Sequence, residues 1–229
     1  MRSNMMLLMA AAIWGLGFVA QRLGMDHMGP FTFNGLRFLL GALSLLPLLW
    51  WLKSRQPRPQ PGSPSGDRRL LLVGGLIAGG VLFSAASLQQ VGLLYTTAAK
   101  AGFITGLYIF LVPVIGLALR HKTGANTWVG ALIAMAGLYY LSVTEEFTIG
   151  YGDLLQVIGA LFWAIHLLVL DHYSNRVAPI RLAGVQFVVC GLLSLGTAFV
   201  IETPTLGGAM AGWQALLYAG LVSVGIGYT

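Results

Sequence analysis

Charged residues are scarce in this sequence. Of its 229 residues, 9% are Asp, Glu, Lys or Arg, whereas 57% are hydrophobic. A soluble globular domain carries about 25% charged residues, so a chain of this length with so few cannot cover itself with a water-facing surface. The shortage excludes a soluble enzyme and a disordered chain, and it leaves a protein that crosses a membrane several times.

Cysteine is almost absent as well. The single Cys190 excludes an internal disulfide and any cysteine-rich metal site. The motifs HExxH, Walker A and GxSxG are also lacking. His166 and His172 are six residues apart, a spacing that puts them on different faces of one helix. We therefore expect no enzymatic activity, no metal and no cofactor.

Long apolar runs, by contrast, fill most of the sequence. A membrane helix needs about 20 predominantly apolar residues, and a window of that length finds eight such segments, most of them separated by turn-forming or polar stretches. We predict an all-α membrane protein that crosses the bilayer at Met5–Leu23, Phe31–Leu52, Leu70–Leu94, Thr96–Leu119, Thr127–Thr144, Leu154–Leu170, Leu182–Ile201 and Trp213–Thr229.

The few charges sort by side of the membrane. If the N-terminus is cytoplasmic, ten of the 13 basic residues lie in cytoplasmic segments and five of the seven acidic residues lie on the opposite side. The basic residues are Arg2, Lys53, Arg55, Arg58, Arg68, Arg69, Arg120, Lys122, Arg176 and Arg181, and the acidic residues are Asp26, Glu145, Glu146, Asp153 and Glu202. This is the positive-inside pattern. The net charge of +6 is therefore interpreted as a topology signal, and we expect no nucleic-acid partner.

The chain contains an internal repeat. At a spacing of 149 residues, Trp14 matches Trp163, Pro30 matches Pro179, Gly35 matches Gly184, Phe38 matches Phe187 and Leu43 matches Leu192; at a spacing of 145, Leu71, Gly75, Leu76 and Gly80 match Leu216, Gly220, Leu221 and Gly225. Five predicted spans separate the copies, and because five is odd, the second copy is inverted relative to the first. Inverted repeats are typical of secondary transporters. We predict a first repeat of five spans over residues 1–145 and a second of three spans over 146–229.

The second repeat is shorter than the first. Thr229 aligns with Ser84 of the first copy, which continues to about Thr144. We expect a C-terminally truncated form of a ten-span protein, lacking about 60 residues of its second repeat.

Three sequence runs resemble one transporter family. They are Ala12–Val19 with Gly29-Pro30 and Leu36-Arg37-Phe38, then Thr97–Phe103 followed by Val112-Pro113, and Gly152–Leu155 at the start of the second repeat. Together they are similar to an EamA-type transporter of the drug/metabolite transporter superfamily. The resemblance implies ten helices in two inverted five-helix halves, an inner-membrane location, and export or uptake of small metabolites or drugs.

Polar residues inside or near the ends of the spans are the candidate substrate contacts. Arg37 lies about 9 Å into its span, and an intramembrane arginine normally faces a cavity or a partner. It is a candidate anion contact, with Asn34 on the same helical face; snorkelling to the headgroups or a structural hydrogen bond is the alternative. Lys100, Gln21 and Gln89 lie near the outer ends of their helices, as do Arg22 and Gln90. They form either an outer polar vestibule with Arg37 or separate interfacial contacts.

Aromatic and histidine side chains give a second group of candidates. Trp14 and Trp163 lie deep in their spans, away from the interfacial belts where tryptophan is enriched, and Tyr108 is similar. They either line a central cavity or pack between the halves. His166 lies near the bilayer midplane, where it is a proton-coupling candidate or forms a helix-bridging hydrogen bond.

These features together predict a secondary transporter that works by alternating access. We expect it in the bacterial inner (plasma) membrane, with a cytoplasmic N-terminus. The expected partners are the lipid bilayer, a small-molecule substrate and, as a further candidate, a second copy of the chain in a homodimer. Two alternatives stay open: a truncated fragment that does not transport, and a membrane-embedded lipid-handling protein or enzyme.

Overall fold

A computed structural model describes residues 2–55, 68–120, 124–142 and 150–228 of the chain, and every regular element in these ranges is a helix. Several predictions lie outside the described residues. They concern the charges of Arg58, Lys122, Glu145 and Glu146 and the repeat boundary at residue 145.

Each predicted apolar segment coincides, within a few residues, with one helix or a consecutive pair. The helices are α1 (Arg2–Gly24), α2 (Pro30–Ser44), α3 (Leu46–Arg55), α4 (Arg68–Gly92), α5 (Ala98–Gly106), α6 (Tyr108–Ala118), α7 (Ala125–Ser142), α8 (Tyr151–Ser174), α9 (Pro179–Ile201), α10 (Leu206–Ala211), α11 (Trp213–Leu217) and the π-helix η2 (Tyr218–Ile226). In the described part of the chain, six helical stretches are long and apolar enough to span a bilayer, and Ala125–Gly137 and Trp213–Ile226 are shorter apolar helices. The chain is thus an all-helical, multi-pass membrane protein.

Local sequence explains where the helices begin and break. Pro30 and Pro179 open α2 and α9, the position at which proline costs no hydrogen bond. Thr97 caps α5, because its side-chain oxygen accepts from the Lys100 backbone N–H at 3.2 Å. Single residues, Leu45 and Leu107, interrupt the α2–α3 and α5–α6 segments.

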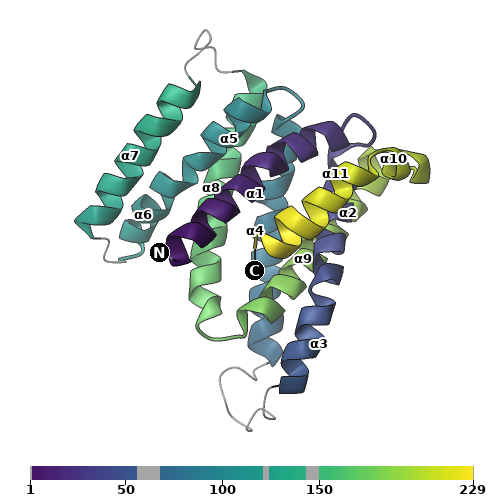
Figure 1. Cartoon of the computed structure of the whole chain (residues 1–229), viewed down its shortest axis with the longest axis horizontal. Coiled ribbons are helices and arrows are strands. Elements are labelled where there is room, and N and C mark those ends of the chain that lie inside the picture. The colour runs from purple at the N-terminus through teal and green to yellow at the C-terminus, as the bar shows by residue number, and fades with distance from the viewer. Residues whose placement is uncertain (1, 56–67, 121–123, 143–149, 229) are drawn as a thin grey trace.

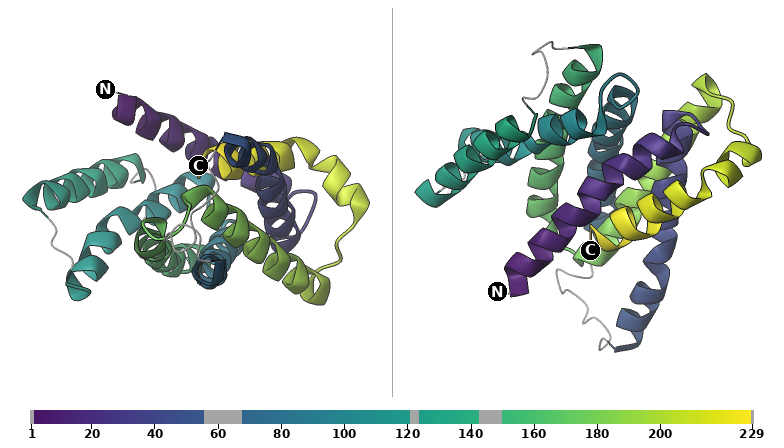
Figure 2. Two further views of the ribbon diagram at one scale, coloured as in Figure 1. Left: turned by 90° about the horizontal axis from the view of Figure 1, so that it is seen from below. Right: turned by 45° about the horizontal axis from the view of Figure 1, so that its top comes forward.

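The centre of the fold consists of α2, α4, α8 and α9, which pack against one another, while α7 and α10 lie at opposite edges (Figure 1; Figure 2, left). Glycines let the central helices approach closely. A methyl group placed on Gly75 or Gly79 of α4 would collide with Val185 or Val189 of α9. The main core cluster draws on α2, α4, α9 and η2.

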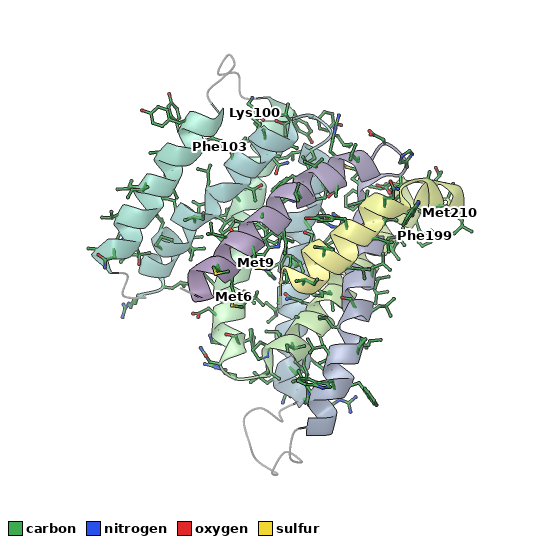
Figure 3. The ribbon with its side chains drawn as sticks, viewed as in Figure 1. Met6, Met9, Lys100, Phe103, Phe199 and Met210 are labelled. Carbon is green, nitrogen blue, oxygen red and sulfur yellow. The ribbon has the colours of Figure 1, made fainter. Side chains whose placement is uncertain are left out.

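The surface of the molecule is largely apolar, and its interior contains polar side chains among the apolar core residues. Met6, Met9, Phe199 and Met210 are exposed and point outward from α1, α9 and α10 (Figure 3), as expected for side chains that face lipid. Buried polar side chains lie instead between the helices: Gln21, Asn34, Arg37, Gln89, Gln90, Gln156, His166 and Gln186. Because buried polar groups are costly in a bilayer unless they are partnered or functional, this interior is the place to look for a site.

Candidate functional site

A chain of amide side chains connects three central helices. Gln89 of α4 donates from Nε2 to Gln21 Oε1 of α1 (3.0 Å) and accepts at Oε1 from Trp163 Nε1 of α8 (2.9 Å). Both glutamines are buried. The structure therefore brings together Gln21, Gln89 and Trp163, which are far apart in the sequence.

Gln156 of α8 extends this network, and sequence reasoning missed it. Its Nε2 donates to the Gln89 carbonyl at 2.9 Å, and its Oε1 accepts from Thr105 Oγ1 of α5 at 3.3 Å. A glutamine inside an apolar predicted span, here near the start of Leu154–Leu170, is the signal that could have identified it.

Arg37 lies in the interior of the molecule. The residue is 4% exposed, which favours an enclosed position over one at the headgroups, and its role as an anion contact stays a prediction. The guanidinium carbon lies 4.9 Å from the Phe38 ring centroid and 5.9 Å from that of Phe33. Its Nε has no hydrogen-bond partner.

The buried amides of Asn34 and Gln90 each donate one hydrogen bond and keep an acceptor oxygen without a partner. Asn34 Nδ2 donates to the Ala86 carbonyl (3.0 Å), and Gln90 Nε2 donates to the Gln21 carbonyl (3.5 Å). These bonds fix the orientation of each amide. Asn34 Oδ1 and Gln90 Oε1 remain buried and without a partner.

An aromatic cluster lies next to Arg37. The Tyr228 ring lies 5.5 Å from Trp14, 6.3 Å from Trp163 and 5.7 Å from Phe187, centroid to centroid. Tyr108 is half-buried at the start of α6, and its part in this cluster stays a prediction. The structure thus places Trp14 and Trp163 around the Tyr228 ring, and Trp14 Nε1 is buried there without a partner.

His166 is buried between α8 and α9. Its Nε2 lies 2.7 Å from Gln186 Oε1, and its Nδ1 has no partner. The first contact is the helix-bridging hydrogen bond that the sequence offered as one of two interpretations; the proton-coupling role stays a prediction.

Lys100 is placed apart from the amide chain, at the outer end of α5 (Figure 3). Its Nζ pairs with Asp153 Oδ2 of α8 at 2.8 Å, and Asp153 also accepts from Thr96 Oγ1 (2.7 Å) and the Gly150 backbone N–H (3.0 Å). Arg22 likewise donates to the Leu93 carbonyl. The contacts of Lys100 and Arg22 therefore tie helix ends together rather than join the amide chain.

Glu202, at the end of α9, makes a second connection at this end of the molecule. Its carboxylate accepts from the backbone N–H groups of Phe31 and Thr32, both at 2.8 Å, and from Thr32 Oγ1 at 2.6 Å. A carboxylate suits the positive end of a helix dipole. Nothing in the sequence near α2 indicates that its cap comes from a residue 170 positions away.

Two cavities open among the described residues at the same end. One of about 430 Å³ is lined by residues around Glu202 and the α1–α2 loop, and one of about 440 Å³ lies between α1 and α11. Arg37 lines neither of them. In the described part of the chain, no group of His, Cys, Asp and Glu side chains could hold a metal ion.

Comparison with known proteins agrees with this architecture. The sequence model of the EamA-like transporter family matches residues 1–143 and 150–229. An "uncharacterized transporter" of Archaeoglobus fulgidus is 34% identical over 202 residues, which cover 87% of this chain and 58% of the relative. The "uncharacterized inner membrane transporter YedA" of Escherichia coli K12 is 24% identical over 93% of this chain and 68% of its own length. The chain thus spans little more than half of the Archaeoglobus protein.

A solved crystal structure shares the fold. It aligns with a TM-score of 0.69 over 98% of this chain and 75% of its own, at 20% sequence identity. At that identity the likeness concerns the arrangement of the helices alone.

Proposed function

Because the chain belongs to the EamA-like transporter family, we propose that it is a secondary transporter that moves a small metabolite or drug across the bacterial inner membrane by alternating access between two inverted halves. The observation that carries this proposal is a pair of mirrored helix contacts at the interface of the two repeats.

The mirrored contacts centre on α2 and α9, which align at a spacing of 149 residues. Phe38 and Phe187 are equivalent in this alignment, and their rings lie 6.0 Å apart. Two equivalent residues in mutual contact are what a two-fold relation between the halves requires. The pair therefore supports a pseudo-two-fold axis that passes close to it.

Two glycines have equivalent surroundings. A methyl group on Gly79 of α4 would lie 2.5 Å from Val189 Cβ and 3.0 Å from the Gln186 carbonyl oxygen; on Gly220 of η2 it would lie 2.7 Å from Leu40 Cβ and 3.1 Å from the Arg37 carbonyl oxygen. Val189 and Gln186 align with Leu40 and Arg37 at the spacing of 149. The contacts favour pairing Gly79 with Gly220, one helical turn away from the pairing of Gly75 with Gly220 that the sequence alignment gives.

Alternating access also needs contacts that form at one end of the molecule and can break. The Lys100–Asp153 ion pair and the Glu202 cap of α2 each join a helix of the first repeat to a helix of the second. Both lie at the end to which the positive-inside pattern assigns the outer face. We infer that opening to the outside breaks both connections.

The test is solute flux in proteoliposomes. The purified protein is reconstituted and loaded with panels of amino acids, nucleosides and cationic drugs, with and without a proton gradient, and protein-free liposomes are the control. We expect flux of at least one solute above the control. No flux of any solute under either condition contradicts the proposal.

A further inference from the structure

We propose that Arg37 binds the carboxylate group of the transported solute, with the indole N–H of Trp14 as a second donor. This inference rests on the proposed transport function, since it assigns the substrate class to the centre of that transporter. It depends on three observations: a buried charge without a counter-charge, two unpartnered donors, and a framework that holds the donors in place.

The first observation is the isolation of the Arg37 charge. In the described ranges the recorded ion pair is Lys100–Asp153, so no carboxylate there pairs with Arg37. A buried guanidinium without an anion is strongly disfavoured, because its desolvation is not offset. A bound anion supplies the missing charge.

The second observation is the pair of free donors. Arg37 Nε and Trp14 Nε1 are both buried and lack hydrogen-bond partners. The Tyr228 ring lies 5.5 Å from that of Trp14 and 5.7 Å from that of Phe187, and Phe187 lies 6.0 Å from Phe38, whose ring centroid is 4.9 Å from the Arg37 guanidinium carbon. A continuous set of ring contacts thus links the two donors, and each donor suits a carboxylate oxygen.

The third observation is the framework around the guanidinium. The rings of Phe38 and Phe33 lie 4.9 and 5.9 Å from its central carbon, at distances typical of cation–π contacts. These rings position the group without neutralising it. The site is therefore preorganised for an anion instead of being closed by a protein carboxylate.

Lys100 does not take this role. It already pairs with Asp153 at 2.8 Å, and its side chain is more than a third exposed at the outer end of α5. Arg37 and Lys100 are the two cations that the sequence offered as substrate contacts. Of these, Arg37 is the one that no carboxylate of the described residues pairs with.

The experiment compares three probes with the same phenyl skeleton: phenylacetate, phenylacetamide and phenethylamine. Their binding to the purified chain in detergent is measured by isothermal titration calorimetry. We expect phenylacetate to bind about tenfold or more tightly than the neutral amide, since a hydrogen bond to a charged group is worth more than a neutral one. Equal affinity for acid and amide, or no binding of any probe at millimolar concentration, overturns the proposal.

Variants locate the site. Arg37→Gln should abolish the preference for the acid, and Trp14→Phe, which keeps an aromatic ring but removes the N–H, should weaken phenylacetate binding several-fold. Arg176→Gln is the matched control, because it removes the same charge from an exposed loop residue. An unchanged preference in a folded Arg37→Gln protein overturns the proposal, and the Trp14→Phe result keeps the test decisive if Arg37→Gln does not fold.

Failure of this inference can be told apart from failure of the transport proposal. Flux of a solute that is equal in wild type and Arg37→Gln leaves the transporter standing and removes the carboxylate site. Selective binding of phenylacetate without flux of any solute supports the site and contradicts transport.

Discussion

His166 and Gln186 form an isolated polar pair in the apolar interior. His166 is 1% exposed and Gln186 is 2% exposed, and their side chains lie 2.7 Å apart. In such a setting the loss of one partner leaves the other buried and unsatisfied, whereas the loss of both removes the need for a bond.

We predict that Gln186→Leu lowers the free energy of unfolding by about 1–3 kcal/mol. The double variant His166→Leu/Gln186→Leu should recover part of that loss. Thermal unfolding in detergent measures both. If the loss of unfolding free energy in the double variant equals the sum of the losses in the two single variants, the pair is not an isolated hydrogen bond. A separate transport assay tests the second role of His166: if the double variant transports without the wild type's dependence on a proton gradient, His166 couples protons.

For single residues, the sequence identified candidate site residues better than it identified the side chains that they contact. The depth of Arg37, Trp14 and His166 in their spans marked them as candidates, because membrane cost depends on depth and chemistry alone. The pairing of Lys100 with Asp153 could not be predicted in the same way. It depends on how α5 and α8 pack, and neither residue is unusual for a helix end.

Among the elements, α4 offers the sharpest test, because two adjacent glycines face different surroundings. A side chain on Gly79 would meet Val189 and the Gln186 carbonyl, whereas one on Gly80 would meet no atom within 4 Å. The first glycine allows α4 and α9 to approach; the second has no such function.

We predict that Gly79→Ala destabilises the protein by about 1–3 kcal/mol, as overpacking does in other well-packed interiors. Gly80→Ala should be neutral or stabilising by up to about 1 kcal/mol, because alanine favours a helix over glycine. Melting temperatures of the two variants in the same detergent decide the matter. Equal shifts would show that the α4–α9 contact is looser than described.

The positions of the helices followed from the sequence, but their internal breaks did not. Twenty-residue apolar runs and the prolines at residues 30 and 179 are local signals, and they located α2 and α9 closely. The interruption at Leu45 precedes Pro47 by two residues, and the one at Leu107 directly follows Gly106; these are local signals of a helix break that the apolar window does not register. The register that we propose for the second repeat match differs by one turn from the sequence alignment, since small apolar residues align almost equally well one turn apart.

For the whole molecule, the ends of the helices separate into two groups. The C-terminal ends of α3 and α8 lie toward the bottom of Figure 1, and the C-terminal ends of α1 and α9 lie toward the top. Of the predicted cytoplasmic basic residues, Arg68 and Arg69 begin α4, and Arg176 and Arg181 lie at the turn from α8 to α9, next to these lower ends. This arrangement allows the predicted orientation to be tested with two single cysteines.

We predict that a membrane-impermeant maleimide added to intact cells labels Thr203→Cys but not Asn175→Cys, each in a Cys190→Ala background. Both positions are exposed, and the native Cys190 is buried. Labelling after cell lysis shows that each cysteine is reactive. The reverse pattern would place the N-terminus outside and overturn the orientation.

The hydrogen bonds between Glu202 and the start of α2 offer a way to measure the proposed outward opening by hydrogen exchange. The amide hydrogens of Phe31 and Thr32 are held by the Glu202 carboxylate, so the outward opening that we propose would expose these two hydrogens to water. Their deuterium uptake would then report the proposed outward opening without a label and without knowledge of the substrate. A solute that holds the outer end closed would slow the exchange at these two amides, and that slowing could identify a substrate before any transport assay does.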